Sequence, residues 1–330
     1  MPKWERIYAC INREKTDRTP ISLWVHYHLQ DRSPRRLAAA TVALYRRYDT
    51  DLIKLTPSGL YGVQDWGAAI RFGRNDWTPP TMNESVISDG GAWKDLPELD
   101  IYDGAYAREL ELIRAVKAEV GNKVPVLMTI FSPLTLAWKL LGDAASAQRI
   151  QLDMKDHSDS FHAGLKTITA TTRRYAQACL DAGADGFFFA TQMANYEVMQ
   201  AESQYEEFGL QYDLDILNAT RKATKVSILH LCRKKLMIDL ASSYPIDIVS
   251  WNNLESGTGL REGIEKTGKA AAGGLNNQRL HLMTPEEVTE SAKAAIGEAG
   301  DRGFLLAPTC VIDARTPEAN LLAARKAVNV

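Results

Sequence analysis

Cysteines are sparse in this sequence, and long apolar runs are missing. Four cysteines in 330 residues are too few for a disulfide framework in a chain of this size. The apolar runs are far shorter than the roughly 20 residues that span a bilayer. The first residues, Met1-Pro-Lys-Trp-Glu-Arg6, lack the apolar core of a secretory signal. We therefore expect a cytoplasmic protein with no membrane segment, in which any special cysteines serve metal binding or catalysis.

An excess of charge of either sign is also missing. The 39 Lys and Arg residues nearly balance the 41 Asp and Glu residues, for a formal net charge of −2. No basic footprint for nucleic acid therefore stands out. With 45% hydrophobic residues, the chain can bury a large core. Its length would permit two domains, but one barrel fits equally well, and we expect a single domain over residues 1–330.

Short β-rich apolar segments alternate with longer amphipathic ones, which is the pattern of repeated βα units. In the longer segments, for example 34–48, 163–182, 212–224 and 284–299, apolar residues recur at intervals of three and four. Eight segments are predicted as strands: Ile21–His26, Asp51–Pro57, Pro125–Phe131, Gly186–Thr191, Lys225–Cys232, Asp247–Asn253, Lys269–Asn276 and Phe304–Cys310. The sequence therefore predicts an α/β fold of the (β/α)8, or TIM-barrel, type.

One segment, from Tyr61 to Tyr102, does not follow this alternation. It contains Trp66, Trp77 and Trp93 together with proline and glycine pairs. We interpret it as a long insertion after the second strand, on the face where barrel enzymes place their active sites. It is either a lid or a β-hairpin without a catalytic role.

A histidine and two cysteines lie at the ends of predicted strands. His230 and Cys232 end the fifth strand, and residues two apart on a strand point to the same side. Cys310 ends the eighth strand, on the same rim of a barrel. Zinc takes such ligands, and three of them leave a fourth position for a reactant. We predict a zinc site here, the alternative being ordinary core packing of these residues. Cys10 and Cys179 lie on helical patterns and are expected to pack.

The order and content of four segments resemble the uroporphyrinogen decarboxylase superfamily along nearly the whole chain. These segments are Pro125–Gly142, Ala176–Asp185, His230–Cys232, and Gly303–Cys310 followed by Thr316–Asn320. In this order, they are similar to four features of the family: a strand with the start of the helix after it, a turn before a strand, a His-x-Cys strand end and the C-terminal segment. The resemblance implies the barrel and an enzyme. Because the superfamily contains both decarboxylases and zinc methyltransferases, the site residues must decide the reaction.

The decarboxylases of this family bind a polyacidic tetrapyrrole through an R-Q-A-G-R motif after the first strand and an aspartate near the second. Here Leu23–Arg32 lacks that motif, and the second strand runs into Thr56-Pro-Ser58 without the acid. By contrast, His230, Cys232 and Cys310 match the zinc ligands of the methylcobamide:thiol methyltransferases, which include those that methylate coenzyme M.

The match implies a Zn²⁺-dependent methyltransferase that moves a methyl group between a corrinoid, either methylcobalamin or a corrinoid protein, and a small soluble acceptor. Zinc deprotonates a bound thiol, which makes it a nucleophile at neutral pH. These enzymes tend to have an acidic residue after the sixth strand that can fill the fourth zinc position. Glu255 is the candidate for this role, or Asn252 and Asn253 line the site instead. The acceptor is accordingly a thiol or another molecule such as a folate.

Further polar residues follow the predicted strands and are candidates for contact with substrate or corrinoid at the rim. These are His26, His28, Ser58, Gln192, Asn252 and Asn276. Packing or loop formation explains several of them equally well. Two other functions stay open: a decarboxylase or lyase that acts on a different carboxylate, and a non-catalytic partner that binds a corrinoid or tetrapyrrole.

Overall fold

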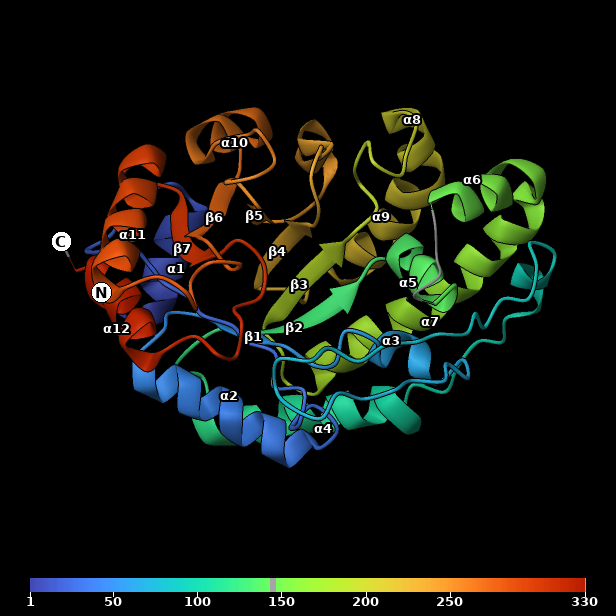
Figure 1. The fold of residues 1–330 in the computed structure, drawn as a ribbon, viewed down its shortest axis with the longest axis horizontal. Helices are drawn as coiled ribbons and strands as arrows, with labels where there is room; N and C mark the ends of the chain where they lie inside the picture. The colour runs from blue at the N-terminus through green and yellow to red at the C-terminus, as the bar shows by residue number, and fades with distance from the viewer. Residues whose placement is uncertain (143–146, 330) are drawn as a thin grey trace.

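Parallel strands in sequence order form the centre of the molecule. The computed structural model describes residues 1–142 and 147–329. Its sheet comprises β1 (Ile53–Leu55), β2 (Val126–Phe131), β3 (Gly186–Thr191), β4 (Val226–Leu231), β5 (Ile248–Trp251), β6 (Ala270–Leu275) and β7 (Phe304–Pro308). Every described residue of these strands is buried. The sheet curls, and helices lie outside it (Figure 1). The predicted α/β barrel architecture is confirmed, with each of these strands inside its predicted segment.

The first predicted strand, 21–26, is an extended segment rather than a regular strand. It forms isolated parallel bridges to β7 at Ile21 and to the loop after β7 at Val25. On its other side, side chains replace part of the backbone ladder. The Ser22 hydroxyl donates to the Leu52 carbonyl at 2.9 Å, and the Ile21 amide donates to a carboxylate oxygen of Asp51 at 2.9 Å. The segment is therefore hydrogen-bonded on both sides although it lacks a continuous ladder.

The helices agree with the amphipathic pattern and with the capping residues at their ends. The prediction for 34–48 coincides with α2 (Pro34–Tyr48), which Ser33 caps. α11 (Pro285–Ala299) begins with a complete capping box between Thr284 and Glu287, which satisfies two otherwise unpaired backbone donors. The other regular helices are α1 (Lys3–Ile11), α4 (Gly104–Val120), α5 (Pro133–Leu140), α6 (Ala147–Asp156), α7 (Ser158–Asp181), α9 (Gln211–Thr220), α10 (Leu260–Thr267) and α12 (Glu318–Ala327).

Short helical turns complete the connections: α3 (Tyr61–Gln64), α8 (Glu202–Tyr205) and the turns Ala92–Asp95, Glu206–Leu210 and Ile238–Ser243. Cys10 on α1 and Cys179 on α7 are buried, as expected. No helix in the described part of the chain has the length and apolar character needed to cross a bilayer.

Two tryptophans of the insertion after β1 form hydrogen bonds through their indole N–H groups. The Trp66 indole donates to the Pro97 carbonyl at 2.9 Å, and the buried Trp93 indole donates to Asp153 of α6 at 3.0 Å. One antiparallel bridge, between Arg71 and Thr81, makes a minimal hairpin. Trp77 is exposed. Trp66 thus links the two ends of the insertion to each other, Trp93 joins the insertion to α6, and a small hairpin lies between them.

A buried carboxylate joins the N-terminal helix to the extended segment 21–26, which is called the closing segment below. Asp51 is fully buried and accepts from Arg6 at 2.6 Å and from Arg18 at 2.7 Å, in addition to the Ile21 amide. One side chain therefore ties together α1, the loop before the extended segment and the residues that precede β1.

Asp51→Ala is expected to lower the free energy of unfolding by about 3 kcal/mol, because it removes the buried carboxylate that two largely buried guanidinium groups share. Arg6 keeps its other partner, Asp17, at 2.7 Å. Chemical denaturation measures the change. The control is Asp215→Ala: Asp215 pairs with Arg173 at 3.0 Å, and both side chains are about half exposed. That substitution is expected to cost less than about 1 kcal/mol. Equal effects of the two substitutions would contradict this role for Asp51.

Candidate metal centre

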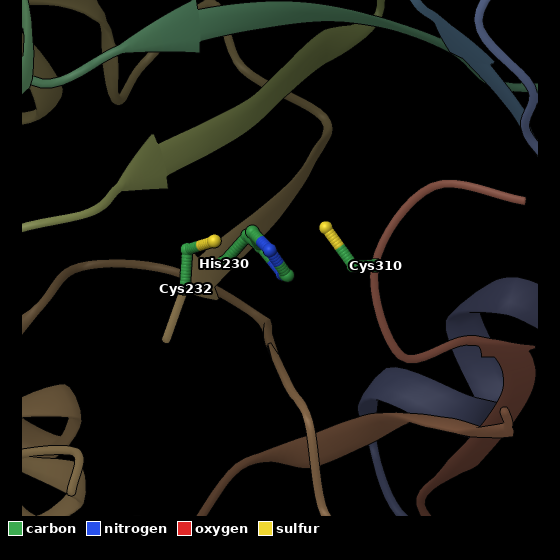
Figure 2. Close-up of side chains that lie close together, drawn as sticks. All are labelled: His230, Cys232 and Cys310. Atoms are coloured by element: carbon green, nitrogen blue, oxygen red, sulfur yellow. The ribbon is translucent and has the colours of Figure 1, made fainter. Parts of the chain in front are cut away.

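Two strand ends bring the predicted triad together. His230 lies on β4 and Cys232 directly follows it, while Cys310 follows β7. One ligand atom from each residue, imidazole nitrogen or sulfur, lies within 4.8 Å of the other two. Figure 2 shows Cys310 reaching the group from a separate segment, opposite Cys232. His230 is buried and both cysteines are half-buried. The three side chains can therefore meet at one ion at the carboxyl end of the strands.

Neighbouring elements hold the backbone of both cysteines. The Cys232 amide donates to the Thr191 carbonyl of β3 at 3.0 Å. The Trp24 indole, from the closing segment, donates to the Cys310 carbonyl at 2.6 Å. The preceding residue, Thr309, donates its hydroxyl to Asn277 at 2.8 Å. The positions of the two sulfurs thus depend on three separate parts of the barrel.

The imidazole of His230 is held at its edge and on its face. Nδ1 lies 3.2 Å from the Ser250 hydroxyl of β5, and the ring stacks on Phe188 with centroids 5.2 Å apart. Because Nδ1 is engaged by Ser250, Nε2 is the nitrogen available to a metal. A hydrogen bond at the other nitrogen is the usual way in which proteins orient a metal-binding histidine.

The two thiols influence each other strongly. Hydrogen bonding from Cys232 lowers the pKa of Cys310 well below its usual range, against the opposing effect of burial, and His230 lowers it further. The same hydrogen bond and burial raise the pKa of Cys232. The two pKa shifts have opposite directions because one hydrogen bond stabilises the thiolate of Cys310 and the thiol of Cys232. Two sulfurs and one imidazole nitrogen form a donor set that suits zinc, which prefers tetrahedral N and S ligands.

A pocket of about 440 Å³ opens over the triad. Its wall includes polar residues from the loops after β4, β5 and β6: Arg233, Lys234, Asn252, Glu255, Asn277 and Gln278. Glu255 accepts from Asn252 at 3.1 Å and from Gln278 at 3.3 Å. Glu255 and Asn252 therefore lie in the wall of the pocket, although no carboxylate belongs to the group of clustered ligand atoms among the described residues.

The remaining rim candidates do not line this pocket. His26 and His28 stack on each other with centroids 5.0 Å apart, and His28 lies 3.4 Å from Asp31. The Ser58 hydroxyl accepts from the Leu60 amide within its own turn. The roles predicted for these residues in substrate contact stay predictions.

Gln192 and Asn276 are held in turns beside the pocket. The Gln192 amide donates to the Thr135 hydroxyl at 2.9 Å. The Asn276 side chain accepts from the amides of Gln278 and Arg279. The next two residues, Asn277 and Gln278, take its place in the pocket wall.

Comparison with known proteins gives the family. A family model described as uroporphyrinogen decarboxylase (URO-D) matches residues 2–330. The chain belongs to the URO-D family. The relatives of this chain include both methyltransferases and decarboxylases, so membership of the family does not by itself determine the reaction.

Methyltransferases stand out among the relatives. The methylcobamide:CoM methyltransferase MtbA of Methanosarcina mazei is 23% identical over 96% of this chain and 94% of its own length. MtbA of Methanosarcina acetivorans is 24% identical over 73% of this chain and 69% of its own length. A uroporphyrinogen decarboxylase of Tolumonas auensis is 23% identical over 63% of this chain and 62% of its own length.

A solved structure shares the fold. The structure of a methyltransferase from Methanosarcina mazei superposes with a TM-score of 0.84 over 99% of this chain and 98% of that chain, at 20% identity. At this identity the likeness shows the URO-D fold alone.

Sequence reasoning missed several charged residues at this URO-D site. Arg233 follows Cys232 directly and has φ of 91°, a strained conformation for a residue other than glycine. Its guanidinium lies over the Trp138 ring at 5.2 Å. Lys54 lies inside the barrel on β1. The run of three basic residues at 233–235 could have drawn attention to Arg233. A lysine in the middle of a predicted strand was the signal for the second.

A buried hydroxyl and carboxyl network lies behind Cys232. The hydroxyls of Tyr205 and Tyr244 donate to one oxygen of Asp213, at 2.9 and 2.6 Å. Tyr205 also lies 2.9 Å from the hydroxyl of Thr191, the residue whose carbonyl accepts from the Cys232 amide. Burial raises the pKa of Asp213 to about 7. The network therefore connects α9 to the strand end that carries the triad.

The raised pKa of Asp213 predicts a specific pH dependence of stability. The folded protein keeps this proton to about pH 7, whereas an unfolded aspartic acid loses it near pH 4. Between these values the folded state binds more protons, so the free energy of unfolding falls as the pH rises. We expect the stability advantage of the wild type over Asp213→Asn to shrink by about 2 kcal/mol from pH 5 to pH 7.

Denaturation at both pH values tests this. Asp215→Asn, on the exposed side of the same helix, is the control and is expected to show a nearly constant difference from the wild type. A difference for Asp213→Asn that is constant or grows toward pH 7 would be inconsistent with the burial argument.

Proposed function

We propose that this protein is a zinc-dependent methyltransferase that moves a methyl group between a corrinoid and a small soluble acceptor. The observation that carries the proposal is the convergence of His230, Cys232 and Cys310 at one point in an open pocket. The relatives named methylcobamide:CoM methyltransferases support it. So does the lack of the arginine motif and the aspartate with which the family's decarboxylases bind their substrate.

Each residue of the triad has a stated role in this proposal. Cys232 and Cys310 supply thiolate ligands, and His230 supplies Nε2 while Ser250 holds the other nitrogen. Zinc bound by them would deprotonate a thiol at its fourth position and so provide a nucleophile at neutral pH. Glu255, held by Asn252 and Gln278, is the side chain that we propose to reach the fourth position when no acceptor is bound.

The reaction needs an acceptor and a methyl donor at the same opening of the barrel, over the triad. A thiol acceptor would enter the 440 Å³ pocket, and the corrinoid, free or on a partner protein, would cover it. The acceptor sulfur, after its proton has passed to solvent, would bond to the methyl carbon, and the carbon–cobalt bond would break with its electron pair left on cobalt. Because the pocket wall contains both charged and amide groups, it can bind a polar acceptor by hydrogen bonds. A folate remains the alternative acceptor.

Purified protein is expected to contain one zinc ion per chain. Cys232→Ser and Cys310→Ser are each expected to lower zinc affinity by more than about tenfold, because a serine hydroxyl is a much poorer zinc ligand than a thiolate. Metal analysis and chelator competition measure the effect. Cys10→Ala is the control, since Cys10 is buried on α1. Substoichiometric zinc in the wild type, or unchanged affinity in both serine variants, would refute the metal centre.

The zinc-loaded protein is expected to demethylate methylcobalamin in the presence of a suitable thiol. The change in the corrinoid spectrum under anaerobic conditions measures turnover, and product analysis identifies the methylated acceptor. Thiols and tetrahydrofolate are tested side by side, and Cys310→Ser is expected to lower the rate at least a hundredfold. Release of carbon dioxide from a carboxylate without any methyl acceptor would favour a decarboxylase. Corrinoid binding without turnover over a broad panel would favour a non-catalytic partner.

A further inference from the structure

A group of exposed arginines lies on the face of the barrel where the strands end. They belong to two segments: residues 27–36, which follow the closing segment and include the first turn of α2, and residues 70–81, the hairpin of the insertion. The group, called the arginine patch below, consists of Arg32, Arg35, Arg36, Arg71 and Arg74. Because the two segments follow the carboxyl ends of the closing segment and of β1, the patch is on the same face as the triad.

Two contacts hold these segments against each other. The guanidinium of Arg32 lies over the ring of Phe72, 5.0 Å from its centroid. Asp76 accepts a hydrogen bond from the Leu29 amide at 2.9 Å. The other four arginines lie within four residues of Arg32 or of Phe72 along the chain. The five positive charges are therefore gathered in one region of the surface.

No carboxylate among the described residues forms an ion pair with the patch. By contrast, exposed arginines elsewhere, such as Arg46, Arg173 and Arg315, each pair with a carboxylate. The two segments contain only two acids: Asp31 is buried, at 2% exposure, and Asp76 is engaged with a backbone amide. The whole chain has a formal net charge of −2. The excess of positive charge is thus a local feature of this surface.

Two of the arginines lie where a helix disfavours positive charge. Arg35 and Arg36 are in the first turn of α2, which contains no acidic residue. The N-terminal end of a helix carries a partial positive charge, so anions stabilise it and cations destabilise it. These two side chains therefore weaken the start of α2 unless an anion lies next to them.

An exposed tryptophan accompanies the patch. Trp77, next to Asp76 in the hairpin, is 53% exposed. Tryptophan and arginine are enriched where proteins bind proteins, because the indole buries a large apolar area and the guanidinium binds carboxylates through two parallel hydrogen bonds. Nucleic acid fits this surface less well. Its backbone would extend beyond the patch, and the rest of the chain is net negative.

We propose that the arginine patch and Trp77 form a docking surface for a partner protein that presents carboxylates with apolar residues among them. The partner's carboxylates pair with the guanidinium groups and remove the unfavourable charge at the start of α2. Trp77 is buried against the apolar residues of the partner. The inference goes beyond the proposed function and does not depend on it, since the charge and the exposed indole are present whatever reaction the triad supports.

Two fluorescently labelled peptides of equal charge serve as probes, and fluorescence anisotropy measures their binding to the full chain. One peptide is a polyglutamate. The other has the same number of glutamates with leucines between them. The first reports charge alone, whereas the second also offers an apolar surface to Trp77.

Two triple variants remove the same number of charges from different places. The patch variant combines Arg35→Gln, Arg71→Gln and Arg74→Gln, and it keeps Arg32 because that side chain packs on Phe72. The control variant combines Arg46→Gln, Arg173→Gln and Arg174→Gln, three exposed arginines that pair with carboxylates outside the patch. Both variants have the same net charge, so any difference between them reports the position of the charges.

The wild type is expected to bind both peptides, and the leucine-containing one more tightly. The patch variant is expected to lose about tenfold in affinity for each peptide, the combined effect of three exposed charge pairs. The control variant is expected to lose less than about twofold, since salt screens distant surface charges. Trp77→Ala is expected to lower the affinity for the leucine-containing peptide alone, by about fivefold.

Three results would overturn the proposal. The first is a wild type that binds neither peptide. The second is an equal loss of affinity in the patch and control variants, which shows an effect of net charge only. The third is a single-stranded oligonucleotide of the same charge that binds more tightly than both peptides and is lost in the patch variant, which identifies a nucleic-acid surface instead. If the patch variant does not fold, Arg71→Gln with Arg74→Gln is compared with Arg173→Gln with Arg174→Gln.

Discussion

The candidate site depends on the curvature of the sheet. His230 and Cys232 are neighbours in the chain, but Cys310 is far away in sequence and reaches them only because β7 lies across the barrel mouth from β4. Strands in strict sequence order, each parallel to the next, place their carboxyl ends on one rim. A flat sheet with the same strand order would keep β4 and β7 apart by the width of the strands between them. Curling is therefore what converts separate donors into one group.

The closing segment links this curvature to the chemistry. Residues 21–25 join β7 to the residues before β1 through hydrogen bonds on both sides. Trp24 of the same segment donates to the Cys310 carbonyl. Because the segment is held by side chains such as Asp51 and Ser22, its position depends on polar groups in the interior. The same residues that complete the barrel thus set the place of the third metal ligand.

Much of the architecture could be predicted because local sequence patterns determine it. Apolar runs separated by amphipathic helices predict parallel strands, and capping residues such as Thr284 predict helix starts. The spacing of His230 and Cys232 predicts a shared direction, and the strand order then places Cys310 on the same rim. The irregular first strand could not be predicted, since its apolar pattern does not reveal that the Ser22 hydroxyl replaces a backbone donor.

The residues that support the metal ligands could not be predicted from the sequence, for a different reason. Ser250 orients His230 only because β4 and β5 pair with these two residues in register. Asn277, rather than Asn276, holds Thr309 because a turn engages Asn276 with the two amides that follow. Such contacts depend on register and on turn geometry to within one residue, which composition and periodicity do not determine.

Charge in the barrel interior sets a second constraint on this site. The pocket over the triad is lined by two cations, Arg233 and Lys234, and by two carboxylates, Glu197 and Glu255. Lys54, inside the barrel, has the rings of Trp24 and Phe188 beside it. A low-polarity interior makes a positive charge on Lys54 costly, since the screening that water provides at the surface is weak there. Burial accordingly lowers the pKa of Lys54 to about 7, and the two rings compensate its charge only in part.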